Sequence, residues 1–303
     1  MNYLIGVTLL WSFSFSLIGV YLAGQVDAYF SVLTRIVLAS LVFLPFLRRR
    51  WLRPDLVAKL MALGATQLGI MYLFYYHSFL LLTVPEVLVF TIFTPIYVTL
   101  IHDLLERRFK PTYLWGALLA VLGAAVIRFD GLTESYVLGF LVVQGANICF
   151  AIGQVGYKVL LARETEQPPQ LAVFGCFYLG ALVVALPAWL LLGTPQYPTS
   201  TLQWGILLWL GIGASGLGYF LWNKGATQVS SGVLAIMNNA LIPAGLLVNL
   251  LLWGKDTDLL RLTLGGLLML ASLWVCQRHG VSERRLKISQ RRCCAPVWPD
   301  RGR

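Results

Sequence analysis

Arg35 and Glu86 are charged side chains within long apolar runs of the sequence, where a charge is costly unless it is paired or functional. Arg35 lies well inside its run, and Glu86 follows Pro85 at the start of another. The planar guanidinium of Arg35 suits a carboxylate ligand. Alternatively, Arg35 extends outward to a polar boundary or pairs with Asp27 or Glu86. Glu86 could take up and release a proton, or it could pair with Arg35 or cap a helix N-terminus.

Aromatic and polar side chains cluster twice, at corresponding places in the chain. The first cluster contains Tyr72, Tyr75, Tyr76 and His77, and the second contains Tyr219, Trp222, Asn223 and Lys224. Aromatic faces with polar tips suit a fused ring system that also forms hydrogen bonds. His77 would add a second cation when protonated, although a lone histidine is more often structural. Lys224 is better explained as the polar end of a helix.

Amide side chains in the apolar runs offer both hydrogen-bond donors and acceptors. Together with Trp11, which lies in the middle of a run, they complete the candidate ligand-binding residues: Asn147, Gln154, Asn238 and Asn239. These amides could equally join one helix to another. Ser12, Ser14 and Ser16 could bond to carbonyl groups one turn earlier. Pro95 and Pro243 are expected to bend two helices and to expose backbone carbonyl groups to a cavity.

The composition indicates that membrane-spanning helices carry these residues. The chain has 303 residues, of which 58% are hydrophobic and 12% charged, and its mean hydropathy is +0.75, whereas an ordinary soluble domain has about 25% charged residues. The formal charge of +10 is concentrated in short connections and at the C-terminal end. It therefore indicates orientation in a membrane, and nucleic acid is not expected as a partner. The five cysteines lack the spacing of a zinc site, so no metal, disulfide or cofactor is expected.

Ten apolar runs are long enough for helices that cross about 30 Å of hydrocarbon. They cover residues 3–24, 29–47, 56–79, 84–102, 112–128, 136–160, 170–192, 202–223, 230–252 and 259–277. The first run lacks the basic residues of a signal peptide and is predicted to be a helix. Most lysines and arginines lie in the connections on one side. The only lysines and arginines assigned to the other side are Arg128, Lys255 and Arg261. The positive-inside rule then places both termini in the cytoplasm.

The two halves of the chain resemble each other at matched positions. Residues 69–79 align with residues 216–226, and Pro95 aligns with Pro243. Each half contains an odd number of predicted spans, five, so the second half enters the membrane from the opposite face. Two inverted halves around one cavity can open it first to one side and then to the other, as in secondary transporters. The predicted fold class is all-α and integral to the membrane, with ten transmembrane helices as two inverted five-helix repeats around a central cavity.

Three stretches also resemble the drug/metabolite transporter superfamily, in its branch of carboxylate, amino acid and amine transporters. They are TLLWSFSFSLIGVYLAG from Thr8 to Gly24, LTVPEVLVFTIFTPIYVTLI from Leu82 to Ile101, and the segment from Leu202 to Leu250. The resemblance implies two EamA-type repeats, at residues 1–131 and 132–277, followed by a basic cytoplasmic tail at 278–303 that is expected to be disordered. It also implies a substrate site near the bilayer midplane, lined by the first, third, fourth, sixth, eighth and ninth helices.

Within that branch the likeness is greatest to carriers of biotin, so the resemblance implies uptake of biotin or a related small carboxylate across a bacterial inner membrane. Export of amino acids, amines or drugs is the alternative within the superfamily. A membrane-embedded receptor or enzyme is less favoured, because the sequence lacks paired intramembrane aspartates and a Walker loop. The expected partners are this substrate and the lipid bilayer. The expected substrate-binding residues are Trp11, Arg35, Tyr72, Tyr76, His77, Asn147, Tyr219, Trp222, Asn223, Asn238 and Asn239, with Glu86 as a candidate for coupling.

Overall fold

The computed structural model describes residues 1–107, residues 134–253 and scattered positions between 109 and 119 and between 260 and 274, and every regular element in this part of the chain is helical. Eight helices are long and apolar enough to cross a membrane. They correspond to the first to fourth and the sixth to ninth predicted spans. The basic tail falls outside the described residues, and so do the fifth and tenth predicted spans apart from these scattered positions.

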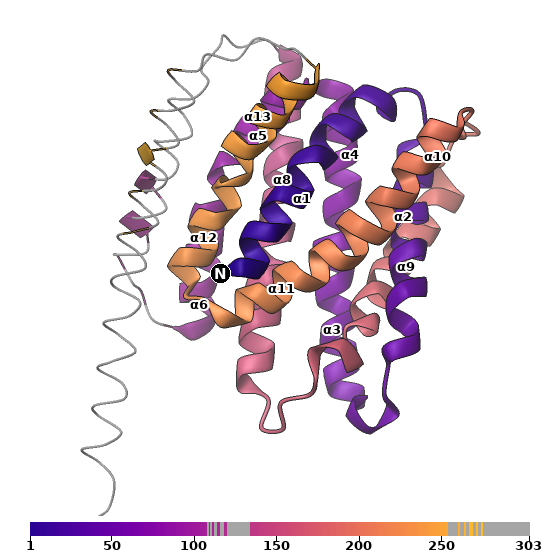
Figure 1. The fold of residues 1–303 in the computed structure, drawn as a ribbon. Helices are drawn as coiled ribbons and strands as arrows, with labels where there is room; N and C mark the ends of the chain where they lie inside the picture. Colours follow the sequence, from indigo (N-terminus) through magenta and orange to yellow (C-terminus); the bar gives the residue numbers. More distant parts are fainter. Residues whose placement is uncertain are drawn as a thin grey trace, which may run out of the picture.

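The first four spans run up and down a single bundle (Figure 1). Their elements are α1 (Asn2–Tyr21), α2 (Ala28–Phe43) with η1 (Leu44–Phe46), α3 (Pro54–Gly64) with η3 (Ala65–Ile70) and α4 (Met71–Leu81), and α5 (Val84–Phe90) with η4 (Thr91–Phe93) and α6 (Thr94–Glu106). A short 3-10 turn, η2 (Arg49–Trp51), lies between the second and third spans. Asp27 caps α2 by accepting a hydrogen bond from the Phe30 amide at 2.7 Å.

The sixth to ninth spans complete the described bundle. Their elements are α8 (Glu134–Arg163), α9 (Gly175–Leu192), α10 (Thr201–Leu208) with η6 (Trp209–Gly218) and α11 (Tyr219–Gln228), and α12 (Ser231–Asn239) with α13 (Leu241–Trp253). The 3-10 turn η5 (Gln170–Ala172) precedes α9. Ser200 and Gln203 form a reciprocal capping box at the start of α10, which fixes where that span begins.

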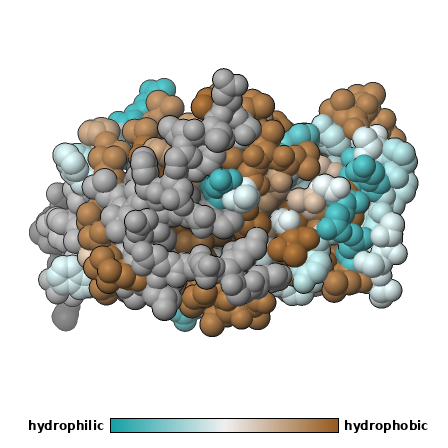
Figure 2. Space-filling view, turned by 90° about the horizontal axis from the view of Figure 1, so that it is seen from above, coloured by the Kyte–Doolittle hydropathy of each residue, from teal (hydrophilic) through white to brown (hydrophobic). Residues whose placement is uncertain are grey.

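The surface of the bundle is apolar and many polar side chains are inside it, which is the reverse of a water-soluble fold. Large side chains such as Leu104 and Leu191 are 76% and 82% exposed, whereas Arg35 is 2% exposed and Gln154 is fully buried. Seen from above in Figure 2, hydrophobic residues surround the rim of the bundle and hydrophilic residues gather toward one side. Such a surface suits contact with lipid tails, since the helices satisfy their backbone groups internally.

The contacts between spans come in corresponding pairs when the second half is matched to the first. Helix α2 packs against η6, and α9 packs against η3. In the same way α1 packs against α13 and α6 against α8, while α1 packs against α11 and α8 against α4. Helices α2 and α9 also pack against each other, as do α6 and α12. The cavity described below lies between these paired elements.

Helices α3 and α9, in the third and seventh predicted spans, cross closely only because each has a glycine at the crossing. A Cβ atom on Gly64 would lie 1.8 Å from the Phe177 carbonyl oxygen, and one on Gly180 would lie 1.9 Å from the Met61 carbonyl oxygen. The two glycines therefore allow backbone to touch backbone from both sides, as small residues do in membrane helix packing.

Two pairs of spans depart from regular α-helix at matching places. The third and eighth spans each contain a π-helical segment, η3 and η6, and such segments often occur at functional sites. The fourth span changes to the 3-10 turn η4 directly before Pro95, and the ninth is interrupted at Ala240 before Pro243. A proline has no amide hydrogen and so removes a bond from the helix ladder.

Candidate functional site

A cavity lies between the two halves of the bundle. Spans one to four contribute Thr8, Trp11, Ser14, Phe15, Ile18, Arg35, Met71, Tyr72, Tyr75, Thr91 and Thr94; spans six, eight and nine contribute Ala146, Asn147, Phe150, Tyr219, Trp222, Asn238 and Leu241. The wall is thus mostly aromatic and aliphatic, with a few polar groups, as is usual for sites that bind small organic molecules.

Arg35 is the cation of this cavity, and its partners in the structure are neutral. Its Nε donates to Ser215 Oγ at 2.9 Å, and its Nη1 and Nη2 donate to the hydroxyl oxygens of Tyr76 and Tyr72 at 3.1 and 2.7 Å. The Tyr72 ring lies 4.4 Å from the guanidinium carbon, in cation–π contact. A guanidinium has five N–H groups, so these three bonds leave two for another acceptor.

Neither acidic residue considered as a partner of Arg35 takes that role. Asp27 caps α2 and accepts hydrogen bonds from the amide and hydroxyl of Thr194, at 3.2 and 3.0 Å. Glu86 accepts a hydrogen bond from the Thr83 amide at 2.7 Å, which caps the start of α5. No Asp or Glu occurs among the described residues that line the cavity.

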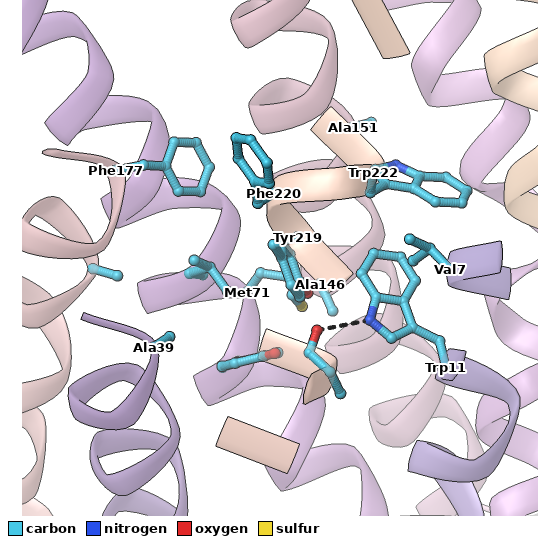
Figure 3. Packing of buried hydrophobic residues seen from close by; sticks show 14 of the residues in the cluster. Val7, Trp11, Ala39, Met71, Ala146, Ala151, Phe177, Tyr219, Phe220 and Trp222 are labelled. Atoms are coloured by element: carbon cyan, nitrogen blue, oxygen red, sulfur yellow. Dashed lines mark hydrogen bonds between the residues drawn. The ribbon is translucent and has the colours of Figure 1, made fainter. Parts of the chain in front are cut away.

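Four aromatic rings form one side of the cavity, and we call Trp11, Phe150, Tyr219 and Trp222 the aromatic box. The Trp11 ring lies 4.9 Å from that of Tyr219 and 5.0 Å from that of Trp222, and Phe150 lies 5.9 and 6.1 Å from the same two rings. Figure 3 shows Trp11, Tyr219 and Trp222 turned toward one another. Two of these rings come from α1 and α8, and two from α11, so both halves of the chain build the box.

Hydrogen bonds fix the two tryptophans of the aromatic box. Trp11 Nε1 donates to the Ala214 carbonyl oxygen of η6 at 2.8 Å, the bond drawn in Figure 3. A Cβ atom on Gly218 would lie 2.6 Å from the same nitrogen, so the indole seats against η6 only because residue 218 is glycine. Trp222 Nε1 donates to Gln154 Oε1 at 2.9 Å. The indole planes are therefore held in place before any ligand arrives.

The interrupted fourth span supplies backbone carbonyl groups that accept hydrogen bonds from amide side chains of other spans. Asn147 Nδ2 and Gln144 Nε2 both donate to the Phe90 carbonyl oxygen, at 2.8 and 3.1 Å. Asn239 Nδ2 donates to the Ile92 carbonyl oxygen at 3.0 Å. Because a carbonyl can only accept, the NH2 group of Asn147 must face Phe90. Its Oδ1 atom then faces away from Phe90, as an acceptor that no described donor uses.

The cavity brings together seven of the predicted substrate-binding residues: Trp11, Arg35, Tyr72, Asn147, Tyr219, Trp222 and Asn238. The other four lie elsewhere. Tyr76 accepts a hydrogen bond from Arg35 but does not line the cavity. His77 lines a separate outer groove, with its ring nitrogens 3.3 Å from the Tyr29 hydroxyl oxygen and 2.7 Å from the Leu73 carbonyl oxygen. Asn223 donates to the Tyr219 carbonyl oxygen of its own helix, and Asn239 is bound to the fourth span.

Sequence reasoning missed several residues in and around the site, and Tyr75, Phe150 and Ser215 illustrate why. Tyr75 was noticed in the first aromatic cluster but not placed among the binding residues, yet it lines the cavity with its ring edge-on to Phe15. Phe150 lines it because it occupies the position in α8 that Trp11 occupies in α1, so the repeat itself was the signal. Ser215, which receives a hydrogen bond from Arg35, lies in a glycine-rich stretch that carries no signal of its own.

One end of the bundle is closed by contacts between spans. Lys158 of α8 donates to the Ala226 carbonyl oxygen at 2.9 Å and also to that of Val229, at the end of α11. Arg53 pairs with Glu164 at 2.6 Å at the same end, where the connections after α2 and α8 lie (Figure 1). The opposite end holds the contact between Asp27 and Thr194.

Comparisons with known proteins place the chain in a family. The sequence model of the EamA-like transporter family matches residues 1–129. A protein of Pseudomonas aeruginosa named "Probable biotin transporter" is 57% identical over 91% of this chain and 96% of its own length. The chain belongs to the EamA-like transporter family. The family resemblance found in the sequence is thereby confirmed, as is the prediction of a transporter rather than an enzyme.

Other relatives and a solved structure agree with membership of the EamA-like transporter family. The "Biotin transporter" of Escherichia coli K12 is 52% identical over 97% of this chain and 99% of its own length, and that of Salmonella typhimurium is 54% identical over 91% and 92%. A crystal structure of a protein only 18% identical matches with a TM-score of 0.73, covering 92% of this chain and 97% of its own. That likeness concerns the fold alone. With its apolar helices, the EamA-like chain is a multi-pass membrane protein.

Proposed function

We propose that this protein takes up biotin across the bacterial inner membrane as a secondary transporter. Relatives named biotin transporters match it at 52% to 57% identity over nearly the whole chain. The observation in the structure that best supports this substrate is Arg35, a buried cation with two N–H groups to spare, facing an aromatic box across one cavity. Biotin combines a carboxylate with a fused bicyclic ring, so each end has a counterpart.

The carboxylate and the bicyclic ring of biotin contact different residues of the cavity in this proposal. The carboxylate accepts hydrogen bonds from the two remaining N–H groups of Arg35, a fork that suits two oxygens. The bicyclic ring packs against the aromatic box, and a ureido N–H group donates to Asn147 Oδ1. A fixed cation in the wall repels amines, so this geometry disfavours the export of cationic drugs.

We propose alternating access between two inverted repeats, residues 1–131 and 132–277, as the mechanism. The paired contacts of α2 with η6 and of α9 with η3 support the repeat, and so do the π-helical segments at matching places. The contact of Lys158 with the end of α11 closes one end of the bundle. In the other state, the equivalent elements of the first repeat would close the opposite end.

We also propose that both termini lie in the cytoplasm, with the tail at 278–303 serving orientation rather than transport. The connections that carry Arg48 to Arg53 and Arg163 lie at one end of the bundle, and that end is then the cytoplasmic one. Glu86 keeps a structural part in this scheme, because its carboxylate caps α5.

Growth of a biotin auxotroph that lacks its own carrier tests the function directly. The gene should restore growth at low external biotin, and cells should accumulate labelled biotin in a manner that excess unlabelled biotin suppresses. Membrane expression without any biotin uptake, combined with efflux of an amine or amino acid, would favour the exporter of the same superfamily.

A further inference from the structure

The cavity has an uncompensated charge when it is empty. Within the described part of the chain, Arg35 is the only Lys, Arg, Asp or Glu that lines it. Its hydrogen-bond partners are the hydroxyl groups of Tyr72, Tyr76 and Ser215, which solvate the guanidinium but do not neutralise it. Outside the cavity, Arg53 is paired with Glu164 and Lys59 with Asp55. No described acidic residue lines the cavity to supply such a counter-charge to Arg35.

A transporter passes through a state that is closed to both sides, and the charge of the cavity matters most there. With the cavity empty, that state holds an unpaired guanidinium away from bulk water, which is unfavourable in a low dielectric. With a monocarboxylate bound, the same state holds a hydrogen-bonded ion pair and no net charge. The loaded protein should therefore switch faster than the empty one.

The membrane potential distinguishes the same two steps. A net charge that moves between the two aqueous phases feels the potential, whereas a neutral cavity does not. The return of the empty protein carries the charge of Arg35 outward, against an inside-negative potential. The loaded step carries none.

We infer that this protein also exchanges one monocarboxylate for another, and that exchange is faster than net uptake because the returning protein is then loaded and neutral. The inference rests on the proposed function, because it takes a monocarboxylate as the substrate. It adds a second activity, anion exchange, and assigns the slow, potential-sensitive step of uptake to the empty cavity.

Purified full-length protein in liposomes tests the inference with labelled biotin. Entry into vesicles that contain unlabelled biotin should exceed entry into empty vesicles by about fivefold or more, since the slow return is bypassed. An inside-negative potential, set with potassium and valinomycin, should slow entry into empty vesicles about fivefold and leave exchange unchanged. These signs do not depend on which way the protein inserts, because net entry of a monoanion is opposed in either orientation.

Two arginine variants with the same chemical change provide the control. Arg35→Gln makes the empty cavity neutral. The neutral amide of biotin should therefore enter empty and preloaded vesicles at equal rates through this variant. Arg53→Gln removes a half-exposed arginine far from the cavity and should keep the full preference for exchange. If Arg35→Gln is folded by gel filtration but inactive, or does not fold, the wild-type measurements alone decide.

The outcomes separate the two proposals. Equal entry into empty and preloaded vesicles, with no effect of the potential, would overturn the exchange inference and indicate that a proton accompanies biotin. Biotin uptake itself would still stand. Absence of biotin entry under every condition, from protein that is folded in the liposomes, would instead overturn the proposed function.

Discussion

At the scale of single residues, the site is built from side chains that are held by protein partners yet keep one hydrogen-bonding group for a ligand. Arg35 uses three N–H groups on Tyr72, Tyr76 and Ser215 and keeps two. Asn147 uses its NH2 group on Phe90 and keeps Oδ1. Side chains fixed in this way lose little freedom when a ligand binds, so more of the interaction free energy remains for affinity.

A substitution of Arg35 that removes the charge should weaken uptake more than one that removes only the planar hydrogen-bonding fork. Arg35→Gln removes the charge, and the biotin concentration for half-maximal uptake should rise about 30-fold, which corresponds to about 2 kcal/mol. Arg35→Lys keeps the charge but not the planar fork, so a rise of about tenfold is expected. Uptake by cells, normalised to the amount of protein in the membrane, measures both. Equal half-saturation in wild type and Arg35→Gln would exclude a contact between Arg35 and the carboxylate.

Asn147 should prove more important than the similar residue Asn223. Asn147→Ala removes an Oδ1 acceptor that no described donor uses, from a residue that lines the cavity, and should raise the half-maximal biotin concentration about fivefold to tenfold. Asn223→Ala removes only a bond to its own helix and a buried Oδ1 atom with no partner among the described residues, so little change is expected. Labelled uptake over a range of biotin concentrations compares the two variants. A larger effect at Asn223 would argue against the placement of the ligand beside Asn147.

The sequence predicted which residue types would form the site better than which individual residues would face it. Tyr72, Tyr75 and Tyr76 lie within a single turn or so of α4, and their order along the chain does not reveal which ring meets the cavity. The answer depends on how α4 is rotated against its neighbours, and the π-helical segment η3 just before it changes that rotation. Ser215 depends in the same way on η6.

At the scale of elements, the long apolar runs predicted eight described spans, because a helix that crosses the bilayer needs a continuous apolar stretch. Hydropathy did not predict the interruptions of regular α-helix within those spans. Hydropathy reports burial in the bilayer and not the hydrogen-bond register of a helix, so it gives no sign of the π-helical segments η3 and η6. The break before Pro95 had a signal in the proline itself, and its consequence, the binding of the Phe90 and Ile92 carbonyl groups by amides, needed the fold.

The crossing of α3 and α9 should tolerate no side chain at its two glycines. Gly64→Ala and Gly180→Ala would each bring a Cβ atom within 2 Å of a carbonyl oxygen, so helices must separate, at a cost of about 1–3 kcal/mol. Gly205→Ala, on α10, is the matched control, because nothing lies within 4 Å of its Cβ position. Melting of the purified protein in detergent should fall for the first two and stay the same or rise for the third. Equal melting of all three variants would contradict this close crossing.

At the scale of the whole molecule, the two ends of the bundle differ in charge and in the contacts that hold them. The end with the pair of Arg53 and Glu164 carries the basic connections. The other end carries Asp27, whose amide donates to the Gln196 carbonyl oxygen at 2.7 Å and whose carboxylate holds Thr194. Connections of the two halves of the chain therefore meet at this end, where arginine and lysine are rare.

Cysteine labelling in intact cells should place Gln25 and Gln196 outside and Arg50 inside. All three side chains belong to exposed residues in connections, so a cysteine introduced there can react without unfolding a helix. In a background without the five native cysteines, a membrane-impermeant maleimide should label Gln25→Cys and Gln196→Cys at once, and Arg50→Cys only after the membrane is made permeable. Truncation before residue 278 should leave both this pattern and uptake unchanged, because the positive charges at residues 48–53 already fix the orientation. Labelling of Arg50→Cys in intact cells, with protection of the other two, would invert the topology and would make the end closed by Lys158 the outer one.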